Sequence, residues 1–258
     1  MSRPANPFRA MGSLAAMELR LTARRGENVL VTMVIPAAVL VFFASSRIVP
    51  GIAGRPVDFL LPGSLALAVI ASGLVNLGIA TAYERNYGVL KRLGSSPLPR
   101  WGLIGAKVLA VLVLEVAQIA LLLAVAILGF GWVVPVDFSA GLFMLAVLLG
   151  TLAFSGLGLL LAGTLRAEAT LAIANGLFLA FLMVGGIVLP IDHLPAQLGA
   201  IAGVLPAAAL SDLFRVALGA TAPVGTATAT SAVVMPLVIL IGWASAAAGL
   251  AVRSFRWE

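Results

Sequence analysis

Long apolar runs dominate the chain and recur six times, near residues 29–46, 60–82, 103–128, 139–164, 169–189 and 231–252. A helix needs about 20 mainly apolar residues to cross the hydrocarbon core of a membrane, which is about 30 Å thick. Lipid cannot satisfy the polar groups of an extended backbone, so each run should be helical. The pattern predicts an all-α, polytopic integral membrane protein with six transmembrane helices.

The composition supports this fold class and excludes several functions. Of 258 residues, 62% are hydrophobic and only 10% are charged, whereas soluble domains have roughly 45–50% and about 25%. The chain has no cysteine and a single histidine, His193, too few for a disulfide framework, a multi-histidine zinc site or a haem held by paired histidines. We therefore expect neither a catalytic site nor a metal site.

The basic residues are distributed unevenly between the apolar runs. With a cytoplasmic N-terminus, Arg47, Arg55 and Arg215 would face outward, and the other thirteen would face the cytoplasm. Those thirteen are Arg3, Arg9, Arg20, Arg24, Arg25, Arg85, Lys91, Arg92, Arg100, Lys107, Arg166, Arg253 and Arg256. The positive-inside rule then predicts that both termini are cytoplasmic. Because the basic residues form no single stripe, the net charge of +6 does not indicate a nucleic-acid partner.

Residues 1–28 precede the first run and are predicted to form a cytoplasmic surface helix. Asn6 suits an N-cap and Pro7 the first helical position. Its polar face would carry Arg9, Ser13, Arg20 and Arg24, and its apolar face Phe8, Met11, Leu14, Ala15 and Leu19. We expect this amphipathic helix to lie along the inner membrane surface. Because Glu18 and Arg25 interrupt the apolar face, a solvated juxtamembrane helix is the alternative.

Residues 190–230, before the last run, are neither clearly membrane-spanning nor polar enough for a soluble loop. Pro190, Pro195 and Pro206 should break this segment into short helices. Broken backbone at membrane depth is tolerated only where it is buried in protein or lines a wet cavity. We expect short re-entrant or surface-lying helices on the outer side.

Residues 83–102, between the second and third runs, mix charged and apolar residues. Leu90 and Leu93 would share one helical face, Gly94 suits a C-cap, and Ser96-Pro97 can start the next helix. The segment should be a short helix and a turn that project below the membrane. A charged hairpin that only fixes topology is the alternative.

The same segment resembles the ABC-2 type permease family in its order of Glu-Arg, Gly, Leu-Lys-Arg-Leu and Ser-Pro, followed by a lysine, Lys107, entering the next span. The resemblance implies that residues 83–102 form the coupling helix that docks on an ATPase subunit. The matching positions are Glu84, Arg85, Gly88, Leu90, Lys91, Arg92, Leu93, Ser96 and Pro97. Asn86 and Val89 depart from the pattern, since a second acid and a threonine are common there.

The outer segment is similar to the same family at Pro190, Leu194-Pro195, Pro206, Asp212, Arg215 and Gly219, although Leu205 replaces the usual Asn. With the N-terminal helix and six runs, the resemblance covers essentially the whole chain, as a single domain over residues 1–258. It implies an exporter in the bacterial cytoplasmic membrane, built from two copies of this chain or from this chain and a sister permease. The substrate class would be a drug, antibiotic, lipid or glycan, and a hydrophobic or amphipathic molecule suits the apolar composition.

An ATP site is not expected in the chain itself. A phosphate-binding loop needs Gly-x-x-x-x-Gly-Lys-Ser/Thr, and neither lysine of this chain, Lys91 or Lys107, follows a glycine. ATP and Mg²⁺ would therefore bind separate cytoplasmic ABC ATPase subunits, and no cofactor is expected here.

Polar residues within the runs are few, and four are candidates for a substrate path: Asn76, Glu115, Gln118 and Asn175. An acid at membrane depth costs a few kcal/mol or more, so Glu115 should face the bundle interior, a partner or a cavity. The alternative is that Glu115 lies nearer the inner headgroups and, like the three amides, only holds helices together. Small residues at Thr151, Ser155, Gly158 and Ala162 should let another helix approach closely.

Two functions of other classes remain open. An ion-coupled secondary transporter would need several buried acids and repeated halves, whereas only Glu115 is clearly within a span. A non-transporting scaffold subunit of a membrane complex is the second alternative.

Overall fold

The computed structural model describes residues 7–24, 26–46, 54–94, 100–219 and 229–254, and these ranges contain helices and turns but no strand. The all-helical prediction is therefore confirmed for the described chain. The helices are α1 Pro7–Arg24, α2 Gly26–Ser46, α3 Pro56–Ile70, η1 Ala71–Asn76, α4 Leu77–Asn86, α5 Val89–Gly94, α6 Arg100–Ala124, η2 Val125–Gly129, α7 Ala140–Thr164, α8 Ala167–Val184, η3 Ile191–His193, α9 Ala196–Ala202, α10 Pro206–Ala217 and α11 Ala229–Ser254.

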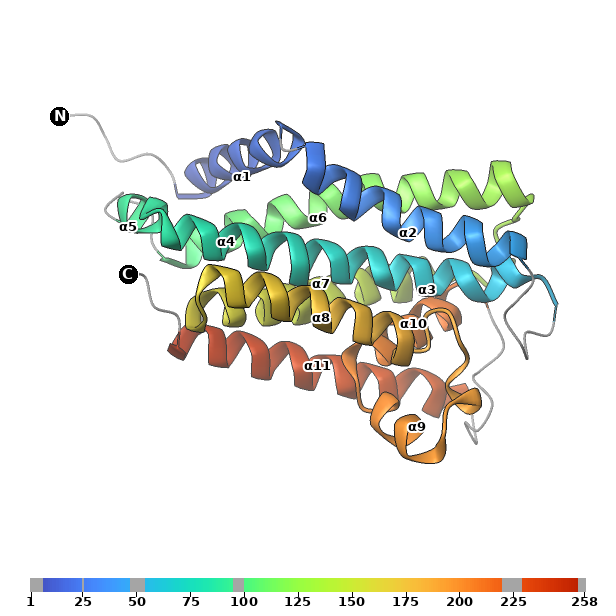
Figure 1. Ribbon diagram of the computed structural model, residues 1–258. Helices are drawn as coiled ribbons and strands as arrows, with labels where there is room; N and C mark the ends of the chain where they lie inside the picture. The colour runs from blue at the N-terminus through green and yellow to red at the C-terminus, as the bar shows by residue number, and fades with distance from the viewer. Residues whose placement is uncertain (1–6, 25, 47–53, 95–99, 220–228, 255–258) are drawn as a thin grey trace.

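The long helices lie side by side in one bundle (Figure 1). Its centre is the continuous helix Pro56–Asn86, made of α3, the π-helical turn η1 and α4, which contacts α2, α6, α7, α8 and α10. Leu60, Leu65 and Leu74 on this helix are fully buried. Helix α11 packs against α7 and α10, which completes the bundle.

The small residues of α7 form a close contact with the central helix. A methyl group at Gly78 would lie 3.0 Å from the Cα of Gly158, and one at Gly158 would lie 2.5 Å from the carbonyl oxygen of Gly73. Ser155 and Ala162 are buried on the same side of α7. The expected close helix approach is therefore confirmed.

Five helices are long and apolar enough to cross a membrane: Pro56–Asn86, Trp101–Gly129, Ala140–Thr164, Ala167–Val184 and Ser231–Arg253. Two further elements are also apolar. Thr32–Ser46 in α2 is a shorter apolar stretch, and α9 and α10 form a pair bent by 75°. The described chain thus has five membrane-capable helices, or up to six if the bent pair is one span. All six predicted runs coincide with helices.

The fifth run was predicted to reach residue 189, but α8 ends at Val184. Gly186 has φ of 66°, in the left-handed region that other residues rarely adopt. The chain therefore turns there, while Ile187 and Val188 remain buried in the core. Ile187 and Val188 are therefore apolar because they are buried, and not because they belong to a membrane-spanning helix.

The segment after this turn is broken into short helices, as the prolines predicted. Pro190 and Pro195 directly precede η3 and α9, and Pro206 is the first residue of α10. Helix α10 contacts α3, α7 and α11, and most of its residues are buried. The α10 part of this segment is therefore in the core rather than on the surface. The predicted stretch 220–228 lies outside the described residues.

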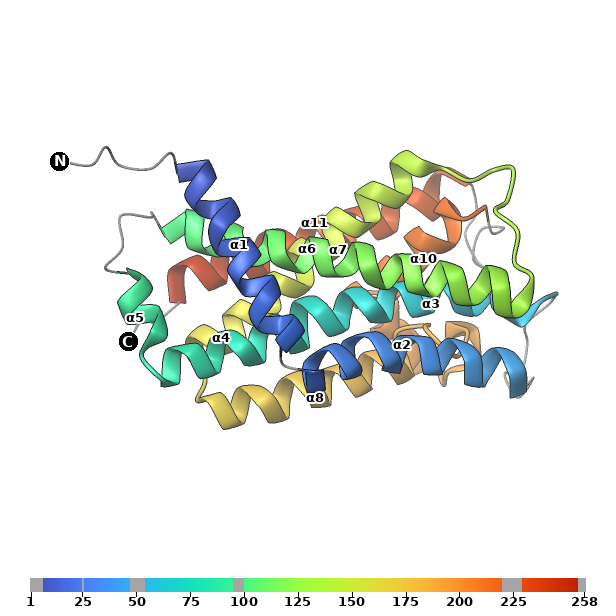
Figure 2. The ribbon, with the colours of Figure 1, turned by 90° about the horizontal axis from the view of Figure 1, so that it is seen from above.

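Helix α1 begins at Pro7 as predicted and crosses obliquely over α6 (Figure 2). It ends at Arg24, and residues 26–28, assigned above to the surface helix, belong to α2. Its apolar residues Met11, Leu14 and Ala15 pack with Ala106 and Ala110 of α6. This face therefore meets protein, because α6 offers small residues at the crossing.

Candidate functional site

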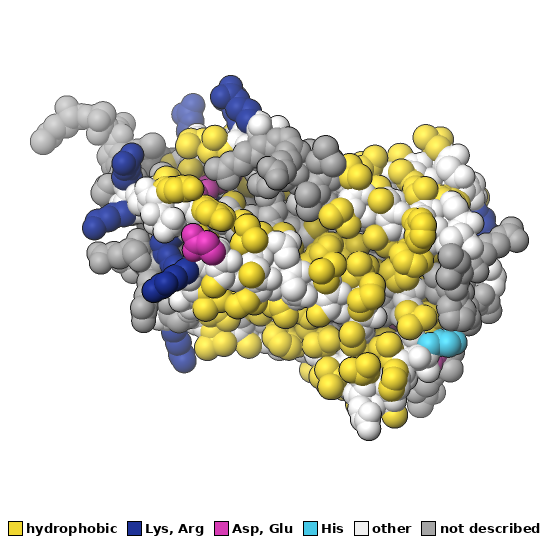
Figure 3. All heavy atoms as spheres, viewed as in Figure 1, with side chains coloured by type: hydrophobic (Ala, Val, Ile, Leu, Met, Phe, Trp, Pro, Cys, Tyr) yellow, Lys and Arg dark blue, Asp and Glu magenta, His cyan; other side chains and the backbone are white. Residues whose placement is uncertain are grey.

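One end of the bundle gathers the elements that carry the ABC-2-like pattern. Helices α1 and α5, the start of α6 and the end of α11 lie at this end, opposite α9 (Figures 1 and 2). Basic side chains project from it, while the flank beside it is largely hydrophobic (Figure 3). This end is the candidate site for contact with another protein.

A tight turn separates α5 from α4. The Tyr87 amide donates to the Tyr83 carbonyl at 2.9 Å, and the Gly88 amide donates to the Arg85 carbonyl at 3.0 Å. Gly88 has φ of 71°, which a glycine adopts without strain. The predicted short helix is present as α5. Ser96 and Pro97 lie outside the described residues, as does the side chain of Leu93.

Lys107 joins three helices at the base of this turn. Its ammonium lies 2.6 Å from the Glu84 carboxylate on α4 and 2.7 Å from the Glu18 carboxylate on α1. The lysine is buried and both acids are largely shielded, so these ion pairs are screened less by water than surface pairs. Glu18, which interrupts the apolar face of α1, thus adds an ion pair to the apolar packing of α1 on α6.

Arg85 connects the same end of α4 to the turn between α7 and α8. Its Nη2 donates to the Leu165 carbonyl in the turn between α7 and α8. Adjacent residues Glu84 and Arg85 therefore connect α4 to α1 and α6 on one side and to α7 and α8 on the other. The end of α4 that leads into α5 is therefore in contact with four helices or their connecting turn.

The residues of α5 divide into an inner and an outer set. Leu90 is only 2% exposed, so within this chain it anchors α5 and is not available as a contact residue. Tyr87, Val89, Lys91 and Arg92 are exposed. These four form the outer face of the α5 segment.

A cavity of about 30 Å³ lies beside Lys107, between α1, α4 and α6. Its polar lining comes from Glu18, Thr22, Asn76 and Lys107, and its apolar lining from Leu19, Leu77, Ala80, Ala110, Val111 and Leu114. A volume of this size accommodates one water molecule next to polar partners. Asn76, a substrate-path candidate, thus lines a small cavity close to the coupling segment.

Glu115 and Gln118 lie in the bundle interior. The Thr151 hydroxyl donates to Glu115 Oε2 at 2.5 Å, and Glu115 Oε1 has no partner among the described residues. Gln118 accepts from the Ser72 hydroxyl at 2.7 Å and donates to the Thr32 carbonyl at 2.9 Å. Both side chains connect α6 to neighbouring helices.

Asn175, the fourth candidate, occupies a different setting. It is half-buried on α8, and its amide donates to the Leu171 carbonyl of the same helix at 2.9 Å. Its neighbours Leu171, Ile173 and Gly176 are exposed. The structure therefore places the four candidates in three settings: a cavity, the bundle interior and an outer helix face.

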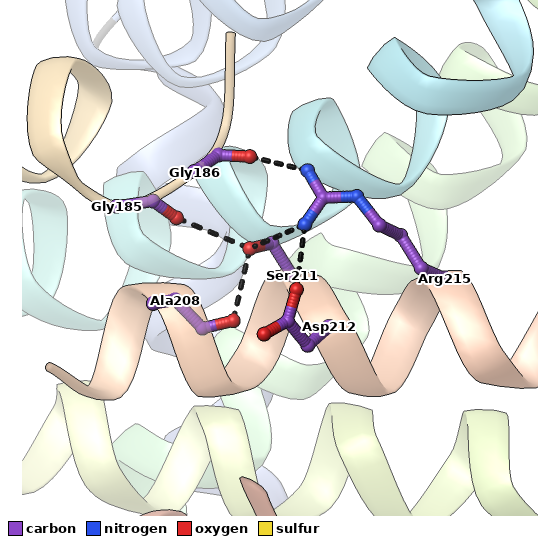
Figure 4. Close-up of polar contacts among 6 residues, drawn as sticks. All are labelled: Gly185, Gly186, Ala208, Ser211, Asp212 and Arg215. Carbon is purple, nitrogen blue, oxygen red and sulfur yellow. Dashed lines mark hydrogen bonds and ion pairs between the residues drawn. The ribbon is translucent and has the colours of Figure 1, made fainter. Parts of the chain in front are cut away.

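Arg215, on α10, is the centre of a second polar cluster, whose contacts Figure 4 shows. Helix α10 lies toward the end of the bundle opposite α5 (Figure 1). It donates to Asp212 Oδ1 at 2.8 Å and to the Gly186 carbonyl, and its guanidinium lies 4.2 Å from the centre of the Phe59 ring. The Ser211 hydroxyl donates to the Gly185 carbonyl at 3.1 Å. Arg215 thus ties α10 to α3 and to the turn after α8.

In a comparison with protein families, the model for the ABC-2 type transporter matches residues 10–218. The chain belongs to the ABC-2 type transporter family. This match includes both clusters, the α5 segment and all four intramembrane candidates. It establishes the chain as a membrane component of an ABC transporter.

Curated relatives of this ABC-2 family member are distant. The probable multidrug ABC transporter permeases YbhR and YbhS of Escherichia coli (strain K12) are 24% and 28% identical over 158 and 156 residues, which is 61% and 58% of this chain. The putative transport permease YvfS of Bacillus subtilis (strain 168) is 25% identical over 198 residues, covering 73% of this chain and 77% of YvfS. The chain matches less than half the length of the two E. coli relatives, 42% and 40%.

Proposed function

We propose that this ABC-2 family member is the permease subunit of an ATP-driven exporter, and that the α5 segment docks on a cytoplasmic ABC ATPase. The observation that carries the proposal is that α5 follows directly on the end of α4, which Glu84 and Arg85 connect to α1, α6 and the turn between α7 and α8. Such an arrangement would transmit movement of a docked ATPase into the bundle. ATP and Mg²⁺ would bind that ATPase.

Residues 1–258 would form one transmembrane domain in the cytoplasmic membrane of a bacterium. Helix α2 would supply the sixth span and α9–α10 a re-entrant pair, which places α1, α5 and both termini in the cytoplasm. The positive-inside distribution supports this orientation, since described basic residues of α1, α5 and the start of α6 share one end.

The substrate path would require a second permease, either another copy or a sister chain. A hydrophobic or amphipathic substrate suits an assembly whose long helices are predominantly apolar, and two relatives are named as probable multidrug ABC transporter permeases. Asn76, Glu115, Gln118 and Asn175 are the polar residues proposed to influence this path.

Docking can be tested by co-purification with the ATPase. The double variant Tyr87→Asp/Val89→Asp places negative charge on the outer face of the α5 segment. It should no longer co-purify with the ATPase, and the permease alone should elute from size-exclusion chromatography at the same volume as the unmodified permease. The control is Val133→Asp/Val136→Asp, at two exposed apolar positions in the loop between η2 and α7. Retention of the ATPase by the α5 variant, or loss in both variants, would contradict docking at α5.

Orientation can be tested separately because the chain has no cysteine. A single cysteine at Val136 should react with a membrane-impermeant maleimide in intact cells, whereas one at Val89 should react only after permeabilisation. The reverse pattern would overturn the assignment. Efflux that follows a proton gradient and needs no ATP would instead favour the ion-coupled transporter.

A further inference from the structure

Helix α1 carries cations that no acid of the described chain neutralises. Arg9, Arg20 and Arg24 are exposed and form no ion pair with any described residue. At about 100° per residue, the three arginines fall on one face of the helix. The single acid within Pro7–Arg24, Glu18, is occupied by Lys107. This arginine face therefore lacks a partner within the described protein.

The arginine face is held in a fixed position. Met11, Leu14 and Ala15 pack against α6 on the other side of α1, and the Glu18–Lys107 ion pair at 2.7 Å adds a polar attachment. A charged face on a packed helix loses less conformational entropy on binding than the same charges on a free tail. Helix α1 is thus a prearranged binding surface.

Exposed apolar side chains flank these arginines. Met17 is 52% exposed and Leu21 38%, and at about 100° per residue both follow the arginine face directly around the helix. Exposed apolar side chains gain nothing from contact with water or with an acidic protein surface. The boundary between lipid headgroups and acyl chains accommodates both kinds of side chain, because arginine stems lie along apolar surface while the guanidinium reaches the phosphates.

Two neighbouring features are those expected of a helix at this boundary. Helix α2, whose apolar stretch begins at Thr32, starts only two residues after Arg24. At the other end of α1, the ring of Phe8 lies 6.3 Å from that of Trp101, which is exposed at the start of α6. Tryptophan at a helix end is typical of the membrane interface.

We propose that the arginine face of α1, formed by Arg9, Arg20 and Arg24, is a binding surface for the anionic headgroups of inner-leaflet phospholipids. The side of the membrane rests on the proposed function, since it requires α1 to be cytoplasmic. Phosphate groups match guanidinium donors in geometry and charge. Removing two of these arginines should weaken binding roughly tenfold or more, and salt should weaken it as well.

The test uses the full chain in nanodiscs of phosphatidylcholine with an increasing fraction of phosphatidylglycerol. Because the chain lacks cysteine, an environment-sensitive fluorophore can be attached to Ala16→Cys, an exposed position one turn from Arg20. Its emission should shift as phosphatidylglycerol increases, and about 0.5 M salt should reduce the shift. In Arg20→Gln/Arg24→Gln the fraction of phosphatidylglycerol that gives half of the emission shift should rise about tenfold or more, or the shift should be lost.

The matched control is Arg166→Gln/Arg253→Gln, which removes two exposed arginines from the same end of the bundle. This variant should respond like the parent chain. Emission that is independent of phosphatidylglycerol, or an equal loss in both double variants, would overturn the proposal. A shift that occurs only when the ATPase is added would overturn it as well, because the arginines would then face a protein. The emission measurement needs neither ATPase nor substrate. A failure of lipid binding by α1 can therefore be distinguished from a failure of ATPase docking at α5.

Discussion

Glu84 and Lys107 are 23 residues apart in the sequence, and their charged groups lie 2.6 Å apart at the base of α5. Lys107 also pairs with Glu18, 89 residues away. One buried cation thus pairs with two carboxylates from different helices. The three residues hold α1, α4 and α6 together at the end where the ATPase is proposed to dock.

Replacing Lys107 with methionine should destabilise the permease strongly. The change leaves two shielded carboxylates without a cation, and breaking a buried ion pair by removing one partner costs about 3–5 kcal/mol. The thermal unfolding midpoint in detergent measures this loss. Arg166→Gln, at an exposed position, should change stability by less than about 0.5 kcal/mol.

A double-mutant cycle separates the ion pairs from packing. If charge imbalance causes the loss, adding Glu84→Gln to Lys107→Met should recover part of the stability, because one of the unpaired carboxylates is removed. Additive losses in the double variant would show that the lysine stem, rather than its charge, is responsible.

The sequence predicts the helices better than their contacts. Apolar runs of sufficient length indicate helices in a membrane because no other structure satisfies the backbone there. The end of α8 was missed because the residues after Gly186 are as apolar as a span but are buried in a turn. The number of crossings is also not fixed by length alone, since α9 and α10 are bent by 75°.

Long-range polar pairs could not be found from the sequence. Glu18 is an interruption when α1 is considered alone, and becomes an ion-pair partner only when α6 lies beside it. Arg215 counts as an outward charge in the topology, yet it is buried against Phe59. Leu90 matches the family pattern, but its burial shows that Tyr87 and Val89 are better candidates for contact with a partner.

Glu115→Gln tests whether the acid itself is needed for transport. Glutamine keeps an oxygen that can accept from the Thr151 hydroxyl, so the unfolding midpoint should stay close to that of the parent. We expect the transport rate in proteoliposomes to fall. Equal rates and equal assembly in both proteins would make Glu115 a bystander.

Thr151→Val provides the structural counterpart to that test. It removes the hydroxyl that donates to Glu115 at 2.5 Å, and an unsatisfied buried polar group costs about 1–3 kcal/mol. Ser155→Ala, one turn away on α7, is the control because the Ser155 hydroxyl has no partner among the described residues. Its unfolding midpoint should change little, and an equal loss in both variants would mean that packing dominates.

Arg215→Lys should weaken the outer cluster although it conserves charge. Lysine cannot present two nitrogens to Asp212 and the Gly186 carbonyl while lying flat over Phe59. The expected loss is about 1–3 kcal/mol in the free energy of unfolding. Arg55→Lys is the control, since Arg55 is exposed and its guanidinium donates to the Phe130 carbonyl at 2.5 Å. A midpoint for Arg215→Lys no lower than that of the control would contradict the role assigned to the planar guanidinium.

Gly158→Ala tests the contact between α7 and the central helix. The added methyl group would lie 2.5 Å from the Gly73 carbonyl oxygen and 3.0 Å from that of Leu74, and backbone atoms at these distances must move apart. Overpacking of this kind costs about 1–3 kcal/mol. Gly249→Ala on α11 adds the same methyl group where no atom lies within 4 Å, so its unfolding midpoint should equal or exceed that of the parent. Because both changes raise helix propensity equally, a lower midpoint for Gly158→Ala alone would isolate the cost of separating α7 from the central helix, and equal midpoints would show that the two helices can part without loss.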